Sequence, residues 1–127
     1  MKPINSINAI NEVKLKAETL QELVVETLEE RKGRDIISID VQGKSSVTDI
    51  MVICSGGSTR QVNALADWVI EKVKEQGVRP LGVEGRESSR WVLVDLGDVV
   101  VHIMLPETRD FYNLEKLWGD QAPSGHG

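Results

Sequence analysis

Two sequence features contain residue types that could carry chemistry, and the first is the segment Ser55–Thr59, with the sequence SGGST. Two glycines let backbone N–H groups approach an anion closely, and the start of a helix favours negative charge. The segment is neither a GxGxxG fingerprint nor a P-loop, because the P-loop lysine is missing. A strand-to-helix turn in which Ser58 caps the helix accounts for the same residues.

The second feature is the pair Asp95 and Asp98, because a Gly-Ser pair before a helix also occurs in nucleotidyltransferases. That chemistry needs two or three carboxylates that converge on magnesium and align phosphates. Asp95 and Asp98 are three residues apart across a turn. Carboxylates two apart on one strand would share a face, so the observed spacing argues against metal-assisted nucleotidyl transfer. We therefore predict no catalytic residue, no metal site and no cofactor.

Histidine and cysteine are scarce in this chain. His102 lies among aliphatic residues of a strand pattern, and the only other histidine is His126. The single cysteine, Cys54, ends an apolar run, which is typical of a buried structural thiol. One cysteine excludes an internal disulfide and a cysteine-based zinc site. Because no Ser-His-Asp or Cys-His arrangement results, we predict that the protein is not an enzyme.

A β-hairpin over residues 90–105, with Gly97-Asp98 as its two-residue turn, gives the strongest strand pattern. The turn fixes which residues face each other and therefore sorts the side chains between two faces. One face carries only aliphatic residues and should pack against helices. Its residues are Val92, Val94, Leu96, Val99, Val101 and Ile103. The other face pairs Trp91 with Met104, Leu93 with His102, and Asp95 with Val100.

This mixed face has two interpretations. A second helix layer could cover it, with His102 and Asp95 hydrogen-bonded at its margin. Alternatively, the face could stay partly open and dock a partner through Trp91, since tryptophan buries much area with few rotors to freeze. A carboxylate at the rim would suit a basic partner. Glu84, between two glycines, could hold its own turn or face that partner.

The elements that position these residues follow the order α-β-β-α-β-β-β-α. Helical spacing predicts a first helix over residues 17–32, ended by Gly33 in the left-handed conformation. Strands are predicted at 36–41, 49–54 and 79–83, the last two joined by a helix into a βαβ unit with parallel strands. One mixed sheet of about five strands, flanked by helices, is the simplest architecture. A short last helix follows Pro106, with an apolar face made of Phe111, Leu114, Leu117 and Trp118.

Length and composition fit one domain, with 127 residues of which 40% are hydrophobic and 28% charged. We expect a flexible N-terminal extension over 1–14, a single α/β domain over 15–120 and a disordered tail over 121–127. The net charge of -5 argues against wrapping nucleic acid, although a basic patch could exist locally or the partner could be basic. We see no membrane span and no signal peptide, and expect a cytoplasmic protein.

Four motifs occur in a specific order: DIISIDVQGKSSVTDIMVICSGGSTRQV, PLGVEG, RWVLVDLGDVVVHIM and ETRDFYNLEKLWGD. Together they closely resemble the ribosomal silencing factor family, also called Iojap. The resemblance covers about residues 15–120. Two departures are Ile50, where an aromatic residue is common, and the Asn-rich first dozen residues, which have no counterpart.

The resemblance implies a small α/β homodimer, nucleotidyltransferase-like in fold but without known catalysis. It implies binding to a basic protein, number fourteen, of the large ribosomal subunit, which blocks joining of the small subunit and represses translation. The family's partner-binding tryptophan matches Trp91, and by strand geometry we extend the contact surface to Glu84, Leu93, Asp95 and His102. Direct nucleic-acid binding would be secondary. Two alternatives remain open: a large-subunit assembly factor with the same interface, and a vestigial or active nucleotidyltransferase that uses the Ser55–Thr59 turn.

Overall fold

The computed structural model describes residues 16–120, so the predicted flexible extension and disordered tail lie outside the described residues. The expected order α-β-β-α-β-β-β-α is confirmed, and a π-helical turn follows the last helix. The helices are α2 (Ala17–Glu30), α3 (Thr59–Glu75) and α4 (Pro106–Tyr112), followed by η1 (Lys116–Asp120). The strands are β1 (Arg34–Asp40), β2 (Ile50–Ser55), β3 (Gly82–Glu84), β4 (Trp91–Asp95) and β5 (Val99–Met104). Within residues 16–120, no helix is long and apolar enough to cross a membrane.

The predicted mixed sheet of five strands is confirmed, with the spatial order β1-β2-β5-β4-β3. Only β2 and β5 pair in parallel, and the other neighbours are antiparallel. Strand β2 is buried along its whole length, as expected for a central strand with apolar side chains on both faces. Strand β3 runs in the same direction as β2 but lies at the far edge, because the hairpin of β4 and β5 pairs between them.

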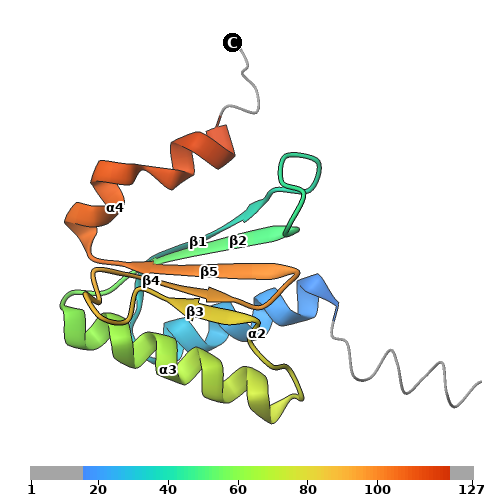
Figure 1. Ribbon diagram of the computed structural model, residues 1–127, viewed down its shortest axis with the longest axis horizontal. Coiled ribbons are helices and arrows are strands. Elements are labelled where there is room, and N and C mark those ends of the chain that lie inside the picture. Colours follow the sequence, from blue (N-terminus) through green and yellow to red (C-terminus); the bar gives the residue numbers. More distant parts are fainter. Residues whose placement is uncertain (1–15, 121–127) are drawn as a thin grey trace, which may run out of the picture.

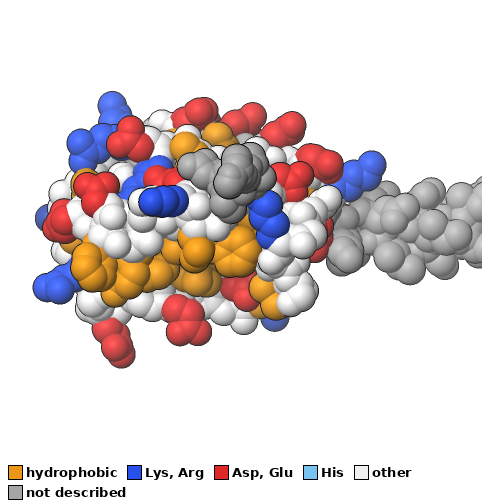
Figure 2. Space-filling model, turned by 90° about the horizontal axis from the view of Figure 1, so that it is seen from above, with side chains coloured by type: hydrophobic (Ala, Val, Ile, Leu, Met, Phe, Trp, Pro, Cys, Tyr) orange, Lys and Arg blue, Asp and Glu red, His pale blue; other side chains and the backbone are white. Residues whose placement is uncertain are grey.

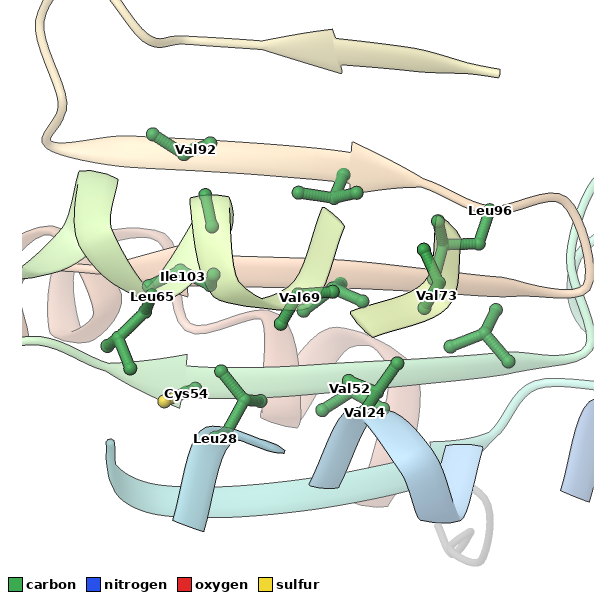
Figure 3. Packing of buried hydrophobic residues seen from close by; sticks show 14 of the residues in the cluster. Val24, Leu28, Val52, Cys54, Leu65, Val69, Val73, Val92, Leu96 and Ile103 are labelled. Carbon is green, nitrogen blue, oxygen red and sulfur yellow. The ribbon is translucent and has the colours of Figure 1, made fainter. Parts of the chain in front are cut away.

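Helices α2 and α3 cover one face of the sheet and form the main core with it (Figures 1 and 3). The hairpin register agrees with the prediction: Val94 faces Val101, and the Leu96 N–H donates to the Val99 carbonyl at 2.9 Å. All of the hairpin residues predicted for the helix-covered face are buried. On α3 they meet the stripe of Val62, Leu65, Ala66, Val69 and Val73.

The helix ends agree with the sequence prediction at α3 and differ from it at α2. Ser58 caps α3, since its Oγ accepts a hydrogen bond from the Gln61 N–H at 3.1 Å. After α2, however, Lys32 rather than Gly33 takes the left-handed conformation, with φ of +67°. Gly33 is required for another reason: a Cβ there would lie 2.5 Å from Sγ of Cys54. That thiol is fully buried, and burial raises its pKa to about 11.

The second face of the sheet is only partly covered, by α4 and η1 (Figure 1). A smaller core forms there, around the buried residues Val41, Met51, Ile53, Met104 and Leu114. The predicted apolar face of the last helix is wrong in part, because Phe111 is 79% exposed and Leu117 is 64% exposed. The reason is the left-handed Asn113, with φ of +51°, which ends α4 and redirects the chain before η1.

A candidate protein-binding face

The second face of the sheet agrees in part with each interpretation of the mixed face. Helical residues cover some of it, and the rest is open. One row of side chains crosses the sheet by register, from Ile37 through Ile53, His102 and Leu93 to Glu84. Ile53 is completely buried and His102 is 6% exposed, whereas Leu93 is half-buried and Glu84 is exposed. Ile37 on β1 is half-buried as well, so the α4 and η1 layer covers the centre of the sheet on β2 and β5 and leaves the β4 and β3 side open.

Trp91 lies at the boundary between the covered and open parts and is half-buried. Its Nε1–H donates a hydrogen bond to Nδ1 of His102 at 2.9 Å. Its ring also packs against Tyr112 of α4, with centroids 4.8 Å apart. Because a hydrogen bond holds one edge and an aromatic ring supports the side chain, the indole presents one fixed orientation.

His102, on the neighbouring strand β5, holds Trp91 in place by accepting its hydrogen bond. Burial lowers the pKa of His102 to about 4, so the imidazole is neutral at neutral pH. Since Nδ1 accepts from the indole, the single ring proton belongs on Nε2. The sequence predicts His102 on the contact surface; in the structure its side chain is buried and contacts Trp91.

The segment between β3 and Trp91 is fastened to α3. Arg86 donates hydrogen bonds to Asn63 and Asp67, and Asn63 in turn donates to Ser89. Gly85 adopts φ of +90°, and a Cβ there would collide with the Trp91 carbonyl oxygen. This segment therefore fixes the backbone at the start of β4. Sequence reasoning missed these supports because they join residues far apart in the chain.

An aromatic hollow lies beside Trp91, with a volume of about 390 Å³. Phe111 and Tyr112 form its other aromatic walls, with ring centroids 4.9 Å apart and an edge-to-face arrangement. Figure 2, which looks at the α4 side of the molecule, shows a band of hydrophobic side chains on this surface. The hollow does not follow from the sequence, because helical spacing places Phe111 on a packed helix face.

Arg109 fixes α4 to the sheet and so positions this hollow. Its side chain is buried, donates to Ser55 Oγ at 2.8 Å and pairs with Glu115 Oε2 at 2.8 Å. Buried arginines are rare unless all their donors have partners. The sequence gives no signal of this burial, because Arg109 stands between Glu107, Thr108 and Asp110 in the polar part of α4.

Carboxylates border the open part of the face. Glu84 is exposed and stands directly opposite Leu93. Asp95 is half-buried, and its Oδ1 accepts a hydrogen bond from the Gly97 N–H at 2.9 Å, so it also stabilises the hairpin turn. Glu107 and Arg90 both line the aromatic hollow, so their charges offset each other there. The open surface is therefore apolar and aromatic at its centre and acidic in part of its rim, and we call Trp91, Leu93, Glu84, Asp95, Phe111 and Tyr112 the Trp91 face.

The Ser55–Thr59 turn uses its polar groups within the fold. Ser58 caps α3, and the Gly57 N–H donates to Oε1 of Gln61 at 2.6 Å. Nε2 of Gln61 donates in turn to the Lys32 carbonyl. Within residues 16–120, no group of three or more His, Cys, Asp or Glu residues could hold a metal ion. The turn thus joins β2, α2 and α3 structurally.

The fold and the site define a small α/β protein with one mixed sheet, whose second face offers a half-open aromatic surface. Residues 14–126 match the family model described as ribosomal silencing factor during starvation. The chain belongs to the ribosomal silencing factor family.

Individual relatives agree with this assignment. The ribosomal silencing factor RsfS of Chromobacterium violaceum is 50% identical, over 87% of this chain and 90% of that protein. A crystal structure of a protein from Chromobacterium violaceum, also 50% identical, has a TM-score of 0.81 and covers 87% of this chain and 92% of that one. The mouse protein named mitochondrial assembly of ribosomal large subunit protein 1 is 39% identical, over 76% of this chain and 44% of its own length.

Proposed function

We propose that this protein binds the large ribosomal subunit through the Trp91 face and represses translation by preventing the small subunit from joining. The bound partner would be a basic ribosomal protein, number fourteen, as the family resemblance implies. The carrying observation is Trp91 itself, half-buried and held by His102 and Tyr112 at the edge of the uncovered sheet. The mechanism is steric, so no bond is made or broken.

The Trp91 face suits such a partner in both shape and charge. Trp91 is already oriented by its hydrogen bond and ring contact, so little side-chain freedom remains to be lost on binding. Aromatic faces attract lysine and arginine side chains. The carboxylates of Glu84 and Asp95 complement a basic surface and would speed the encounter.

The remaining site residues take different parts in this proposal. Leu93 and Glu84 would contact the partner directly, since they lie on the open part of the sheet. Asp95 would contribute its exposed side while it holds the hairpin turn. His102 would act through Trp91. We further propose that the protein acts in the cytoplasm, where subunits join, and as a homodimer, as the resemblance implies.

The test is cosedimentation of the tagged full chain with isolated large subunits. The parent protein should sediment with the subunit, and Trp91→Ala should lose at least about tenfold in affinity, as expected for an interface hot spot. Trp68→Ala is the matched control, because Trp68 is a half-buried tryptophan of α3 that contacts Arg31 on the other side of the sheet. Equal binding by Trp91→Ala would refute the site, and no binding by the parent would refute the function.

A role in assembly of the large subunit is a second candidate, favoured by the name of the mouse relative. The two roles can use the same surface, so binding alone does not separate them. A subunit-joining assay with mature subunits does. Silencing predicts that added protein lowers the yield of joined ribosomes, whereas a pure assembly role predicts an unchanged yield and enrichment on large-subunit precursors.

A further inference from the structure

A separate cleft lies at the opposite end of α3 from the Ser55–Thr59 turn. After α3 ends, the chain turns at Gly77, with φ of +83°, and continues through residues 78–81 to β3. Figure 1 shows this turn at the yellow-green end of α3, next to the edge strand β3. The last turns of α3, the connecting segment and Arg86 line an open cleft of about 890 Å³. That volume is in the range of small-molecule sites.

One wall of this cleft is apolar and held in place by the core. Its residues are Ile70, Val78, Pro80 and Val83, all of them half-buried. Ile70, Val78 and Val83 pack on their inner side against the main core. Their outer side remains exposed to the cleft. An apolar surface fixed in this way can receive a flat ring without rearrangement.

The other walls carry positive charge. Lys74, Arg79 and Arg86 line the cleft, and no carboxylate of residues 16–120 lines it, although the whole chain has a net charge of -5. Arg86 is neutralised in part by Asp67. The side chains of Lys74 and Arg79 have no ion-pair partner among residues 16–120.

Ordinary structural roles explain only part of this charge. Lys74 lies in the last turn of α3, where a cation offsets the helix dipole. Glu71 and Glu75 line an adjoining hollow that shares Ile70 and Lys74 with the cleft, so they reduce the field on the Lys74 side. Arg79 lies beyond the helix and beyond its capping residues, and neither role applies to it.

We propose that this cleft binds a phosphorylated nucleotide, with the base against the apolar wall and the phosphates between Lys74 and Arg79. Both a free nucleotide and a nucleotide within single-stranded RNA offer this chemistry. A base suits a fixed apolar surface, and phosphates suit unpaired lysine and arginine. The cleft uses no residue of the Trp91 face, so this proposal does not depend on the proposed function.

The experiment is calorimetric titration of the full chain with GTP, with inorganic pyrophosphate and with a short single-stranded RNA oligonucleotide. Saturable binding of GTP or RNA is expected, with amide NMR shifts at Val78, Arg79 and Gly82. Lys74→Gln and Arg79→Gln should each weaken it by about tenfold or more, the usual scale for a charge-assisted hydrogen bond. Lys72→Gln is the matched control, because Lys72 lies in the same helical turn, pairs with Glu75 and does not line the cleft.

Further variants test the base contact and the independence from the Trp91 face. Val78→Ser should weaken the binding of GTP and leave the binding of pyrophosphate unchanged. Trp91→Ala should leave the affinity for both ligands unchanged. Tighter binding of RNA than of GTP would assign the nucleotide to RNA, and the reverse would assign it to the free pool. The proposal is overturned if neither GTP nor RNA saturates, if pyrophosphate binds as tightly as GTP, or if Lys72→Gln is as harmful as Lys74→Gln.

Discussion

The indole N–H of Trp91 donates a hydrogen bond to Nδ1 of His102, 2.9 Å away on the neighbouring strand. The two residues are diagonal neighbours, since Trp91 stands opposite Met104 and His102 stands opposite Leu93. Trp91 reaches the surface while His102 is 6% exposed. A buried neutral histidine therefore sets the orientation of the exposed tryptophan.

The first prediction concerns the pH dependence of stability. Burial lowers the pKa of folded His102 from 6.5 to about 4, so unfolding takes up a proton between these values. His102 thus contributes stability that is complete above about pH 6.5 and is lost as the pH falls toward 4. The loss is on the order of 3 kcal/mol, at about 1.4 kcal/mol per pKa unit.

Urea unfolding of the parent and of His102→Gln between neutral pH and pH 4 measures this contribution. The carboxylates titrate in both proteins and cancel in the difference. The gap in the free energy of unfolding between parent and variant should shrink as the pH falls. A gap that stays constant over this range would contradict a buried neutral His102.

The second prediction concerns Gly85, where an added Cβ meets two obstacles. Its φ is +90°, which strains any L-residue, and the Cβ would collide with the Trp91 carbonyl oxygen. Gly43→Ala is the matched control, because Gly43 has φ of +83° and nothing within 4 Å of the added Cβ. Gly43→Ala should lower the free energy of unfolding by about 1 kcal/mol, through backbone strain alone. Gly85→Ala should cost about 3 kcal/mol or more, and equal losses in urea unfolding would speak against the collision.

The third prediction concerns the contact of Gly33 with Cys54. A Cβ at Gly33 would lie 2.5 Å from the Cys54 Sγ and 3.1 Å from the Leu28 carbonyl oxygen. Gly33→Ala should therefore destabilise the protein by about 1–3 kcal/mol, as overpacking does. On a Cys54→Ala background the same change should cost less, because the sulfur is gone. A double-mutant cycle measures this coupling, and purely additive losses would place the strain elsewhere.

The fourth prediction concerns Arg109 and the mobility of α4. Arg109→Ala removes the hydrogen bond to Ser55 and the ion pair with Glu115. The free energy of unfolding should fall by about 2–3 kcal/mol. Because these contacts fasten α4, hydrogen exchange of the α4 amides should accelerate while α2 and α3 stay protected. Arg60→Ala, an exposed change at the start of α3, should leave both quantities nearly unchanged. Unaltered exchange in α4 would show that its apolar contacts suffice.

Local chemistry explains the sequence predictions that agree with the structure. A two-residue turn at Gly97-Asp98 sets the register of β4 and β5, and strict alternation then assigns each side chain to a face. The cap of α3 likewise depends only on Ser58 and Gln61, three residues apart. Such features involve neighbours in the chain, so residue type and spacing determine them.

The sequence by itself thus determined the elements, the hairpin register and the mixed character of the face that carries Trp91. Only the tertiary structure decided how much of that face is covered, because coverage depends on the direction that the chain takes after Asn113. It also decided that His102 lies beneath Trp91 and that Lys74, Arg79 and Arg86 share one cleft. Sequence periodicity indicates which side of a helix or strand is apolar. Packing between segments distant in the chain determines which other element covers that side.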